Sequence, residues 1–364
     1  MAFIERRLFY HFDWLLLATI LVICGMGITM IYSATQSTAP RLFVSQVYAL
    51  GLGLIALLLA LSIDYRTLAD KSHWLYGITL ALLIYVMLFG VVRGGARRWI
   101  PLGVFNLQPS EFAKLAVALV LAKFFGENRR TQPTGGDLMT GAALTVVPML
   151  LIARQPDLGT AVTLIPVYLA IAYVAGLPMR VLGIIALAAV LMAPVAWRFA
   201  LKDYQKSRIM MFIDPSKDTR GAGYQQIQAR ITVGSGGLWG KGFLKGTQGQ
   251  LRFLPVASTD FIFSAWAEEQ GFVGVLIALG LYLLVIARSL EAARLSKDRL
   301  GSFLVLGILA SFTFQVLYNV TMSAGLAPVK GLTLPLMSYG GSSLIATLTG
   351  FGLILNVRMR RFTN

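Results

Sequence analysis

The 364-residue chain has the composition of a membrane protein, not of a soluble globular domain. Hydrophobic residues make up 57% of it and charged residues 13%, against about 45–50% and about 25% in soluble domains. Its net charge is +16. The basic residues lie between apolar segments, where anionic lipid headgroups are the nearest partner. We therefore expect membrane lipids as partners, and no nucleic acid.

The apolar residues are gathered in ten segments, most of them close to the ~20 residues that cross a bilayer. The fifth is the weakest, because it is short and contains Pro148. The first is too long for the apolar core of a signal peptide and is read as a retained helix. The chain is thus expected to be an all-α, polytopic integral membrane protein. The predicted spans are 14–33, 42–63, 73–92, 109–125, 141–153, 158–176, 179–199, 262–287, 302–323 and 342–357.

Basic residues concentrate in alternate short connections, which places both termini on the cytoplasmic side by the positive-inside rule. The large segment 200–261, between the seventh and eighth spans, then lies outside the cell as one extracytoplasmic loop of a single domain, 1–364. This loop is rich in Gly, but Gly240-Lys241 lacks the Gly five positions earlier and the following Ser or Thr of a nucleotide-binding P-loop.

Four outer connections, 93–108, 153–157, 200–261 and 324–341, each carry a polar cluster. The first holds Arg97, Arg98 and Trp99 and leads to Glu111 and Lys114 at the start of the fourth span. Basic residues in a short outer loop oppose the charge bias of the other connections and so indicate an anionic ligand. Glu111 and Lys114 are three residues apart, so a plain ion pair at a helix end remains an alternative for them.

The other clusters hold two acids and a broken segment. Asp157 follows Gln155-Pro156, and Asp260 stands where the long loop re-enters the bilayer; simple helix capping is an alternative for both. Segment 328–343 contains Lys330, Ser338 and Ser342 among Gly and Pro residues that forbid a continuous helix. Non-helical backbone at membrane depth is tolerated where it is buried in protein or lines a cavity.

Together the clusters predict a cavity at the outer face, with basic residues suited to a phosphate and apolar walls suited to a lipid tail. His11 and His73 lie on the opposite side, so a His-dependent hydrolase or His-ligated metal site is excluded there. The single Cys24 excludes an internal disulfide. Carboxylates and Lys must carry any chemistry.

At these residues the sequence resembles the SEDS proteins (shape, elongation, division and sporulation). The resemblance covers nearly the whole chain in family order. Two motifs, 221–224 and 246–248, look like the elongation branch, and the division-specific branch is the alternative. A departure is Val256-Ala257-Ser258, where relatives often carry a Glu; it puts in doubt an acid there, but not Asp260. The matching motifs are Gly95-Ala-Arg97-Arg98-Trp99, Gln108-Pro-Ser-Glu111-Phe-Ala-Lys114, Gln155-Pro-Asp157-Leu-Gly-Thr160, Asp203-Tyr-Gln205, Gly221-Ala-Gly-Tyr224, Gly234-Ser-Gly-Gly237, Gly246-Thr-Gln248, Thr259-Asp-Phe-Ile-Phe263, Ala267-Glu-Glu269 and Ser338-Tyr-Gly-Gly-Ser342.

The resemblance implies a peptidoglycan glycosyltransferase that polymerises lipid II into β-1,4 glycan at the outer face of the bacterial cytoplasmic (inner) membrane. Asp260 is then the expected general base, and Arg97, Arg98, Lys114 and Lys330 are expected to stabilise the departing diphosphate. The other expected substrate-binding residues are Trp99, Glu111, Asp157, Ser338 and Ser342. A divalent cation, Mg or Mn, could share the phosphate, since Mg²⁺ needs one or two carboxylates there; no organic cofactor is expected.

The resemblance also implies a class B penicillin-binding protein and the elongation machinery as partners. Two other function classes stay open. A lipid II flippase would use the same cavity and broken helices, and would fail to make glycan in detergent. A non-catalytic scaffold would keep its function in an Asp260→Ala variant that still binds its partner.

Overall fold

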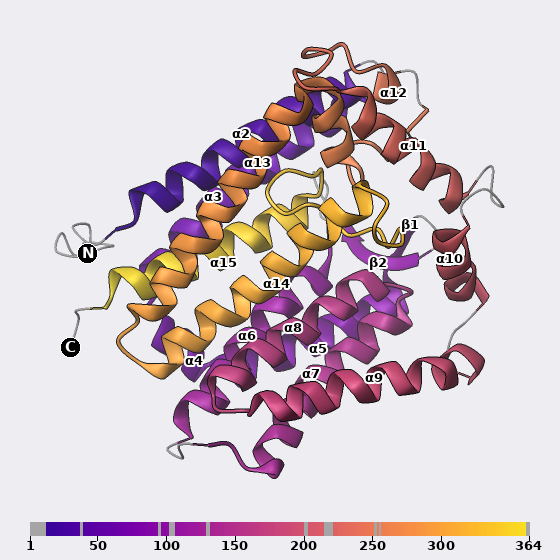
Figure 1. Ribbon diagram of the computed structural model, residues 1–364. Coiled ribbons are helices and arrows are strands. Elements are labelled where there is room, and N and C mark those ends of the chain that lie inside the picture. Colours follow the sequence, from indigo (N-terminus) through magenta and orange to yellow (C-terminus); the bar gives the residue numbers. More distant parts are fainter. Residues whose placement is uncertain are drawn as a thin grey trace.

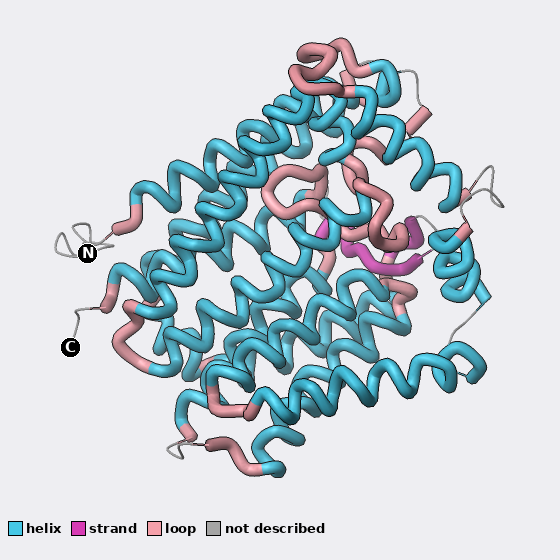
Figure 2. Tube along the Cα trace, viewed as in Figure 1, coloured by secondary structure: helices cyan, strands magenta, loops and turns pink. Residues whose placement is uncertain are grey.

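Each of the ten predicted spans contains a helix in the computed structural model, which describes residues 12–36, 39–93, 96–101, 106–128, 132–199, 203–214, 221–250, 253–254 and 256–361. Most of the long helices run roughly along one direction and form a bundle (Figures 1 and 2). The helices are α2 (Trp14–Thr35), α3 (Pro40–Ser62), α4 (Tyr65–Asp70), α5 (Ser72–Phe89), α6 (Pro109–Glu127), α7 (Gly135–Arg154), α8 (Leu158–Val174), α9 (Met179–Phe199), α10 (Asp203–Ile213), α11 (Ala222–Ser235), α12 (Thr247–Gln250), α13 (Ile262–Arg294), α14 (Arg299–Ser323) and α15 (Gly341–Met359).

Eight helices of the described residues are long and apolar enough to cross a membrane: α2, α3, α5, α7, α9, α13, α14 and α15. Helix α8 is apolar but has 17 residues. Helix α6 has 19 residues, some of them charged. The prediction of an all-α, multi-pass membrane protein is therefore confirmed.

The structure differs from the prediction at two of the spans. The weak span 141–153 is part of a 20-residue helix, α7, which begins at Gly135. Its start is fixed by a capping box, in which the Thr134 hydroxyl accepts from the Asp137 N–H at 3.2 Å and the Thr134 N–H donates to Asp137 at 2.8 Å. The predicted span 73–92 ends as helix at Phe89 and continues into a small antiparallel sheet of β1 (Val91–Arg93), β2 (Ala96–Pro101) and β3 (Asn106–Leu107).

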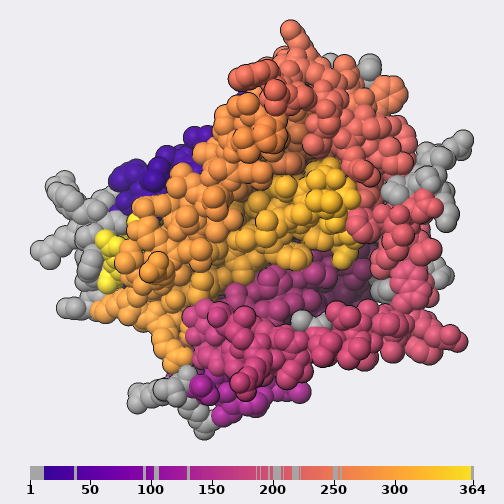
Figure 3. Space-filling view, in the orientation of Figure 1, coloured from indigo at the N-terminus to yellow at the C-terminus, as the bar shows by residue number. Residues whose placement is uncertain are grey.

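The bundle has two distinct ends. Helices α10, α11 and α12 and the small sheet gather at one end, which we call the loop end (Figure 1). The start of α2 and the end of α15 lie together at the opposite end, which we call the terminal end. Helix α9 lies at the periphery, with side chains such as Ile184, Leu187 and Leu191 exposed, as expected of a helix that faces lipid (Figures 1 and 3).

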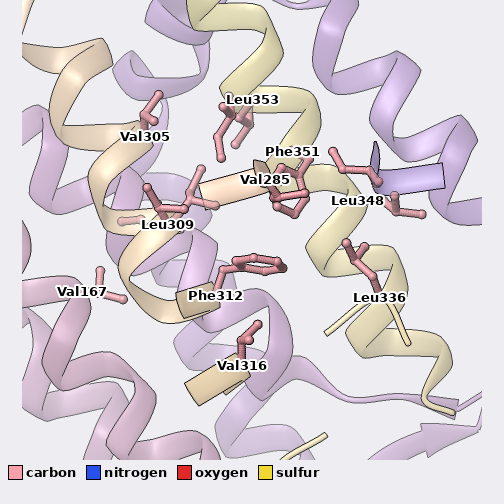
Figure 4. Close-up of a cluster of buried hydrophobic side chains, with 14 of the residues drawn as sticks. Val167, Val285, Val305, Leu309, Phe312, Val316, Leu336, Leu348, Phe351 and Leu353 are labelled. Carbon is pink, nitrogen blue, oxygen red and sulfur yellow. The ribbon is translucent and has the colours of Figure 1, made fainter. Parts of the chain in front are cut away.

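The core of the bundle is apolar and draws on most of the long helices, with α14 and α15 near its centre. Phe312 of α14 meets Phe351 of α15 edge to face, with ring centroids 5.0 Å apart, and branched side chains from α8, α13 and the segment before α15 close around them (Figure 4). Glycines allow the closest approach: a Cβ on Gly352 would lie 2.7 Å from the Leu57 carbonyl oxygen of α3. This packing holds the two ends at a fixed separation.

At the terminal end the charges of different helices cancel one another. Asp13, which caps α2, is 4% exposed and lies 2.7 Å from the Arg358 guanidinium and 3.1 Å from that of Arg288. Two further pairs, Arg360 with Asp64 at 3.2 Å and Arg66 with Asp298 at 3.0 Å, join neighbouring elements. These contacts fasten the ends of five helices and their short connections to each other.

A buried amide completes this closure. The side-chain nitrogen of Asn356 lies 2.7–2.9 Å from the carbonyl oxygens of Ala60, Leu61 and Ile63, which end α3. Its side-chain oxygen accepts the Tyr65 N–H at 3.3 Å. The last carbonyls of a helix lack intrahelical partners, so Asn356 supplies the donors that this helix end needs.

At the loop end, the Gly-rich part of segment 200–261 is docked onto α13 by acids. Glu268, which is 1% exposed, accepts from Lys241 at 2.6 Å and from the Thr247 N–H at 3.0 Å. Gly271 interrupts α13 with φ +66°, and the loop backbone at Gly240 packs directly against it. The part of the loop from Gly240 to Thr247 is thus packed directly against α13.

Candidate active site

A cavity of about 590 Å³ opens at the loop end, within the range of about 300–1,000 Å³ typical of ligand sites. All four predicted polar clusters contribute to its wall, so the predicted convergence is observed. Helix α10 adds Ile209. The lining residues are Arg98, Trp99, Gln108, Glu111, Pro156, Asp157, Leu158, Gly159, Thr160, Ile209, Val256, Thr259, Asp260, Pro328, Lys330, Gly331, Leu332, Thr333, Tyr339, Gly340 and Ser343.

The adjacent Arg97 and Arg98 of strand β2 have different environments. Arg98 lines the cavity and donates to the carbonyl oxygens of Gln155, at 3.0 Å, and Pro156. Arg97 is exposed, lies outside the lining and donates to the Leu88 carbonyl at 3.3 Å. The geometry therefore leaves Arg98, and not Arg97, as a candidate to meet a ligand in this cavity.

Asp157 both caps a helix and lines the cavity. Its carboxylate accepts from the Thr160 N–H at 3.2 Å, as the N-cap of α8, and from the Gln108 amide at 3.0 Å. Burial raises the pKa of Asp157, while Arg98, 3.9 Å away, and the bonds from Thr160 act in the opposite direction. The carboxylate is thus held by protein groups on several sides, which suits it to shaping the wall.

Glu111 and Lys114 form the ion pair that their spacing allows. The Lys114 ammonium lies 2.7 Å from Glu111 and 3.2 Å from the side-chain oxygen of Gln315 on α14. Glu111 is 5% exposed and Lys114 6% exposed. Glu111 lines both the main cavity and a second cavity of about 20 Å³, whereas Lys114 lines the second cavity and not the main one. Lys114 therefore meets the wall of the main cavity through its ion pair with Glu111.

Asp260 lies half-buried in the cavity wall, in the turn that precedes α13. This turn is fixed by the last cluster: the Ser338 hydroxyl donates to the Thr259 carbonyl at 2.6 Å, and the Tyr339 N–H donates to the Ser258 carbonyl at 2.9 Å. Ser338 is itself buried and lies outside the lining. Its hydroxyl also accepts the Leu334 N–H at 2.8 Å, so Ser338 joins the segment before α15 to the turn that carries Asp260.

Lys330 lines the same wall. Its ammonium lies 5.7 Å from the centre of the Tyr318 ring, within the range of a cation–π contact. The next residue, Gly331, has φ +67°, and a Cβ there would lie 3.5 Å from a carboxylate oxygen of Asp260. The Asp260 turn and the Lys330 segment thus face each other closely across a residue without a side chain.

Ser342 and Trp99 complete the predicted set. Trp99 lines the cavity. Ser342 is buried outside it, where its hydroxyl donates to the Asn106 carbonyl at 2.7 Å and accepts the Gln108 N–H at 2.9 Å. Ser342 therefore ties the start of α15 to the small sheet.

Three buried residues that hold the site were not singled out from the sequence: Gln46, Gln315 and Asn319. Gln46 of α3 donates to the Ser338 carbonyl at 3.2 Å and accepts the Gly340 N–H at 3.1 Å. Each is a polar side chain within an apolar span, which was the available signal, because such residues are costly in a membrane and are retained for a partner.

The donor set for a metal is small. Among the described residues, no group of three or more His, Cys, Asp or Glu side chains could hold a metal ion. A cation bound by one or two carboxylates together with substrate phosphates has different requirements, and the cavity acids Glu111, Asp157 and Asp260 are of the right chemical type.

Comparison with known proteins identifies the family of this chain. A family model described as "Cell cycle protein", which covers FtsW, RodA and SpoVE, matches residues 11–362. The chain belongs to this family. It is the SEDS family indicated by the sequence motifs.

Members of the SEDS family resemble the chain over its whole length. Peptidoglycan glycosyltransferase MrdB of Escherichia coli K12 is 39% identical over 353 residues, which cover 96% of this chain and 94% of MrdB. A probable peptidoglycan glycosyltransferase FtsW of Trichlorobacter lovleyi is 34% identical over 358 residues, covering 95% and 93%.

Two solved structures share the fold. One, titled "Structural coordination of polymerization and crosslinking by a peptidoglycan synthase complex", has a TM-score of 0.84 at 36% identity and covers 97% of this chain and 99% of its own. The rod shape determining protein RodA of Thermus thermophilus has a TM-score of 0.73 at 34% identity, covering 97% and 98%. These likenesses support the elongation branch that the motifs favoured.

Proposed function

We propose that this chain is a peptidoglycan glycosyltransferase that polymerises lipid II during cell elongation, with Asp260 as general base. The observation that carries the proposal is the loop-end cavity, in whose wall the half-buried Asp260 faces the segment of Lys330. The other two described acids of the lining, Glu111 and Asp157, are each 5% exposed and held by cationic or amide partners. Asp260 lies where a substrate hydroxyl can reach it.

The reaction joins the 4-hydroxyl of one lipid-linked disaccharide to C1 of another. The hydroxyl oxygen forms the new bond as the bond from C1 to the diphosphate oxygen breaks, so an α-linked donor gives a β-1,4 product by inversion. The electron pair of the broken bond leaves with undecaprenyl diphosphate, and the hydroxyl proton passes to Asp260. General base catalysis of this kind contributes roughly 10²–10⁴ in rate.

Negative charge grows on the departing diphosphate, and Lys330 and Arg98 are the basic residues of the lining that can meet it. Fixed positive charge aimed at developing negative charge is usually the largest catalytic effect. We include a divalent cation, Mg or Mn, in the proposal. A lining acid other than the base, Glu111 or Asp157, would hold it together with diphosphate oxygens and so add positive charge there, since Mg²⁺ in phosphate sites keeps one or two carboxylates.

The proposal places the loop end at the outer face of the bacterial inner membrane and both termini in the cytoplasm. The charge distribution of the short connections supports this orientation. A class B penicillin-binding protein is the proposed partner, because the solved structure with a TM-score of 0.84 is described as a peptidoglycan synthase complex that coordinates polymerization and crosslinking.

The test is polymerisation by purified protein in detergent, with radiolabelled lipid II, separated on a gel, with and without partner and divalent metal. Glycan strands are expected from the wild-type chain, and their loss in Asp260→Asn. A flippase has no bilayer to act across in detergent, so monodisperse wild-type protein that yields no glycan under any of these conditions would overturn the enzymatic proposal. The ion pairs that close the terminal end favour an enzyme with one open side over alternating access.

A further inference from the structure

Asn319, near the loop end of α14, joins the two segments that carry the proposed catalytic groups. Its side-chain nitrogen donates to the Asp260 carbonyl at 2.9 Å and to the Leu332 carbonyl at 2.7 Å. Both acceptors are oxygens, so both hydrogens of the amide nitrogen are used and the orientation of the amide is fixed. Asn319 is 0% exposed and lies outside the cavity lining.

The preceding residue, Tyr318, contacts the same segment at another point. Its hydroxyl donates to the Pro328 carbonyl at 2.8 Å, and its ring lies under the Lys330 ammonium. Two successive residues of one rigid helix therefore fix the segment 328–332 and the backbone of Asp260 together. Val329, Lys330 and Gly331 lie between the carbonyls of Pro328 and Leu332 that this helix holds.

We infer that Asn319 is a positioning residue for glycosyl transfer, which sets the separation between the Asp260 carboxylate and the Lys330 ammonium. The inference rests on the proposed roles of those two groups. Both lie on irregular backbone, which has no helix or sheet of its own to fix it. A misplacement of about 1 Å can cost ~100-fold in rate, so one amide that bridges both segments controls transition-state geometry without touching substrate.

The chain offers a matched control at its terminal end. Asn356 is also 0% exposed, and its side-chain nitrogen also donates to backbone carbonyls, those of Ala60, Leu61 and Ile63. Asn319→Asp and Asn356→Asp each replace a buried donor by an oxygen of the same shape that faces carbonyl oxygens. A purely structural role would make the two variants alike in the activity of their folded fraction.

The experiment measures kcat and KM for lipid II with monodisperse full-length protein, corrected for the folded fraction. Asn319→Asp is expected to lower kcat at least thirtyfold with KM within about threefold, while Asn356→Asp keeps kcat within about threefold. If Asn319→Asp does not fold, Asn319→Ser, which leaves one hydroxyl donor, replaces it with an expected fall of at least fivefold. Equal kcat values in the folded Asn319 and Asn356 variants would overturn the inference.

A double variant separates this inference from the proposed function. Because Asn319 is argued to act partly through Asp260, adding Asn319→Asp to Asp260→Asn should lower the residual rate by a smaller factor than Asn319→Asp lowers the wild-type rate. If Asp260→Asn abolishes polymerisation and Asn319→Asp alone behaves like wild type, the positioning role fails and the general base stands. If Asp260→Asn remains active, the proposed base fails and the inference fails with it.

Discussion

At the terminal end, Asp13, Asp64 and Asp298 each meet an arginine within 3.2 Å, whereas at the loop end Arg98 and Lys330 line a cavity of about 590 Å³. The helices that connect the ends are the same. The difference lies in the connections: short capped turns between helices at one end, and long segments rich in Gly and Pro at the other. In one bundle, the charged residues at the terminal end pair with one another, whereas basic residues at the loop end line a cavity that can hold a ligand.

Asp260→Asn is the strongest test of this contrast, because it removes the proposed base and keeps the shape of the side chain. We expect a loss of about 100-fold or more in polymerisation, measured on a gel with protein that remains monodisperse. A variant that keeps more than a tenth of the wild-type rate would mean that the carboxylate is structural.

Lys330→Gln should lower glycan synthesis at least tenfold, equivalent to about 1.4 kcal/mol of transition-state stabilisation. Arg97→Gln is the matched control at the same end, since Arg97 is exposed outside the cavity, and its rate should stay within about threefold. Arg129→Ala with Arg130→Ala, which lie outside the described residues, should also leave the rate of inserted protein within about threefold. Similar losses in all three variants would point to a general charge requirement.

Lys114→Ala should also lower the rate of folded protein about tenfold, because Glu111 in the cavity wall loses its ionic partner. Breaking a buried pair typically costs about 3–5 kcal/mol, so a lower unfolding temperature should accompany it. Glu111→Gln combined with Lys114→Gln removes both charges and should recover much of the stability and the rate. A double variant as inactive as Lys114→Ala would indicate that Lys114 itself contacts the diphosphate.

Asp13→Asn should have the smallest effect on the rate, within about threefold for folded protein. It should instead lower the free energy of unfolding by about 3 kcal/mol, because Arg288 and Arg358 lose their shared carboxylate. Thermal unfolding in detergent and polymerisation by the monodisperse fraction measure the two separately. A large fall in kcat would show that the terminal end is coupled to the cavity and break the comparison.

The sequence predicted the helices and the convergence of the polar clusters well, because long apolar segments and outward-facing charge are strong signals. The sequence could not show which residues of a cluster line the cavity and which support its wall. Arg97 and Arg98 are adjacent residues of the same type, and the structure is needed to show that Arg98 lines the cavity and Arg97 does not. The spacing of Glu111 and Lys114 already offered their ion pair as an alternative. The backbone contact of Ser342, by contrast, is with Asn106, 236 residues away in sequence.

The supporting residues Gln46 and Asn319 illustrate the other limit. Each is one polar residue in an apolar span, and what it binds is a backbone carbonyl or N–H of another segment, 59 to 294 residues away for the bonds to Asp260 and Gly340. Every residue supplies such groups, so no side-chain pattern marks the partner. The existence of a contact could be suspected from the sequence, but its target needed the fold.

Helices α3 and α15 share the most extensive contact of any two elements, and Asn356 caps the end of α3 from the far end of the chain. During synthesis, α3 is therefore inserted in the bilayer well before its partner α15 has been made. Until then the small residues of its contact face, such as Gly53, are open to lipid. A chain interrupted before α15 should keep its earlier spans inserted yet expose this face, which would make it a target for membrane quality-control proteases.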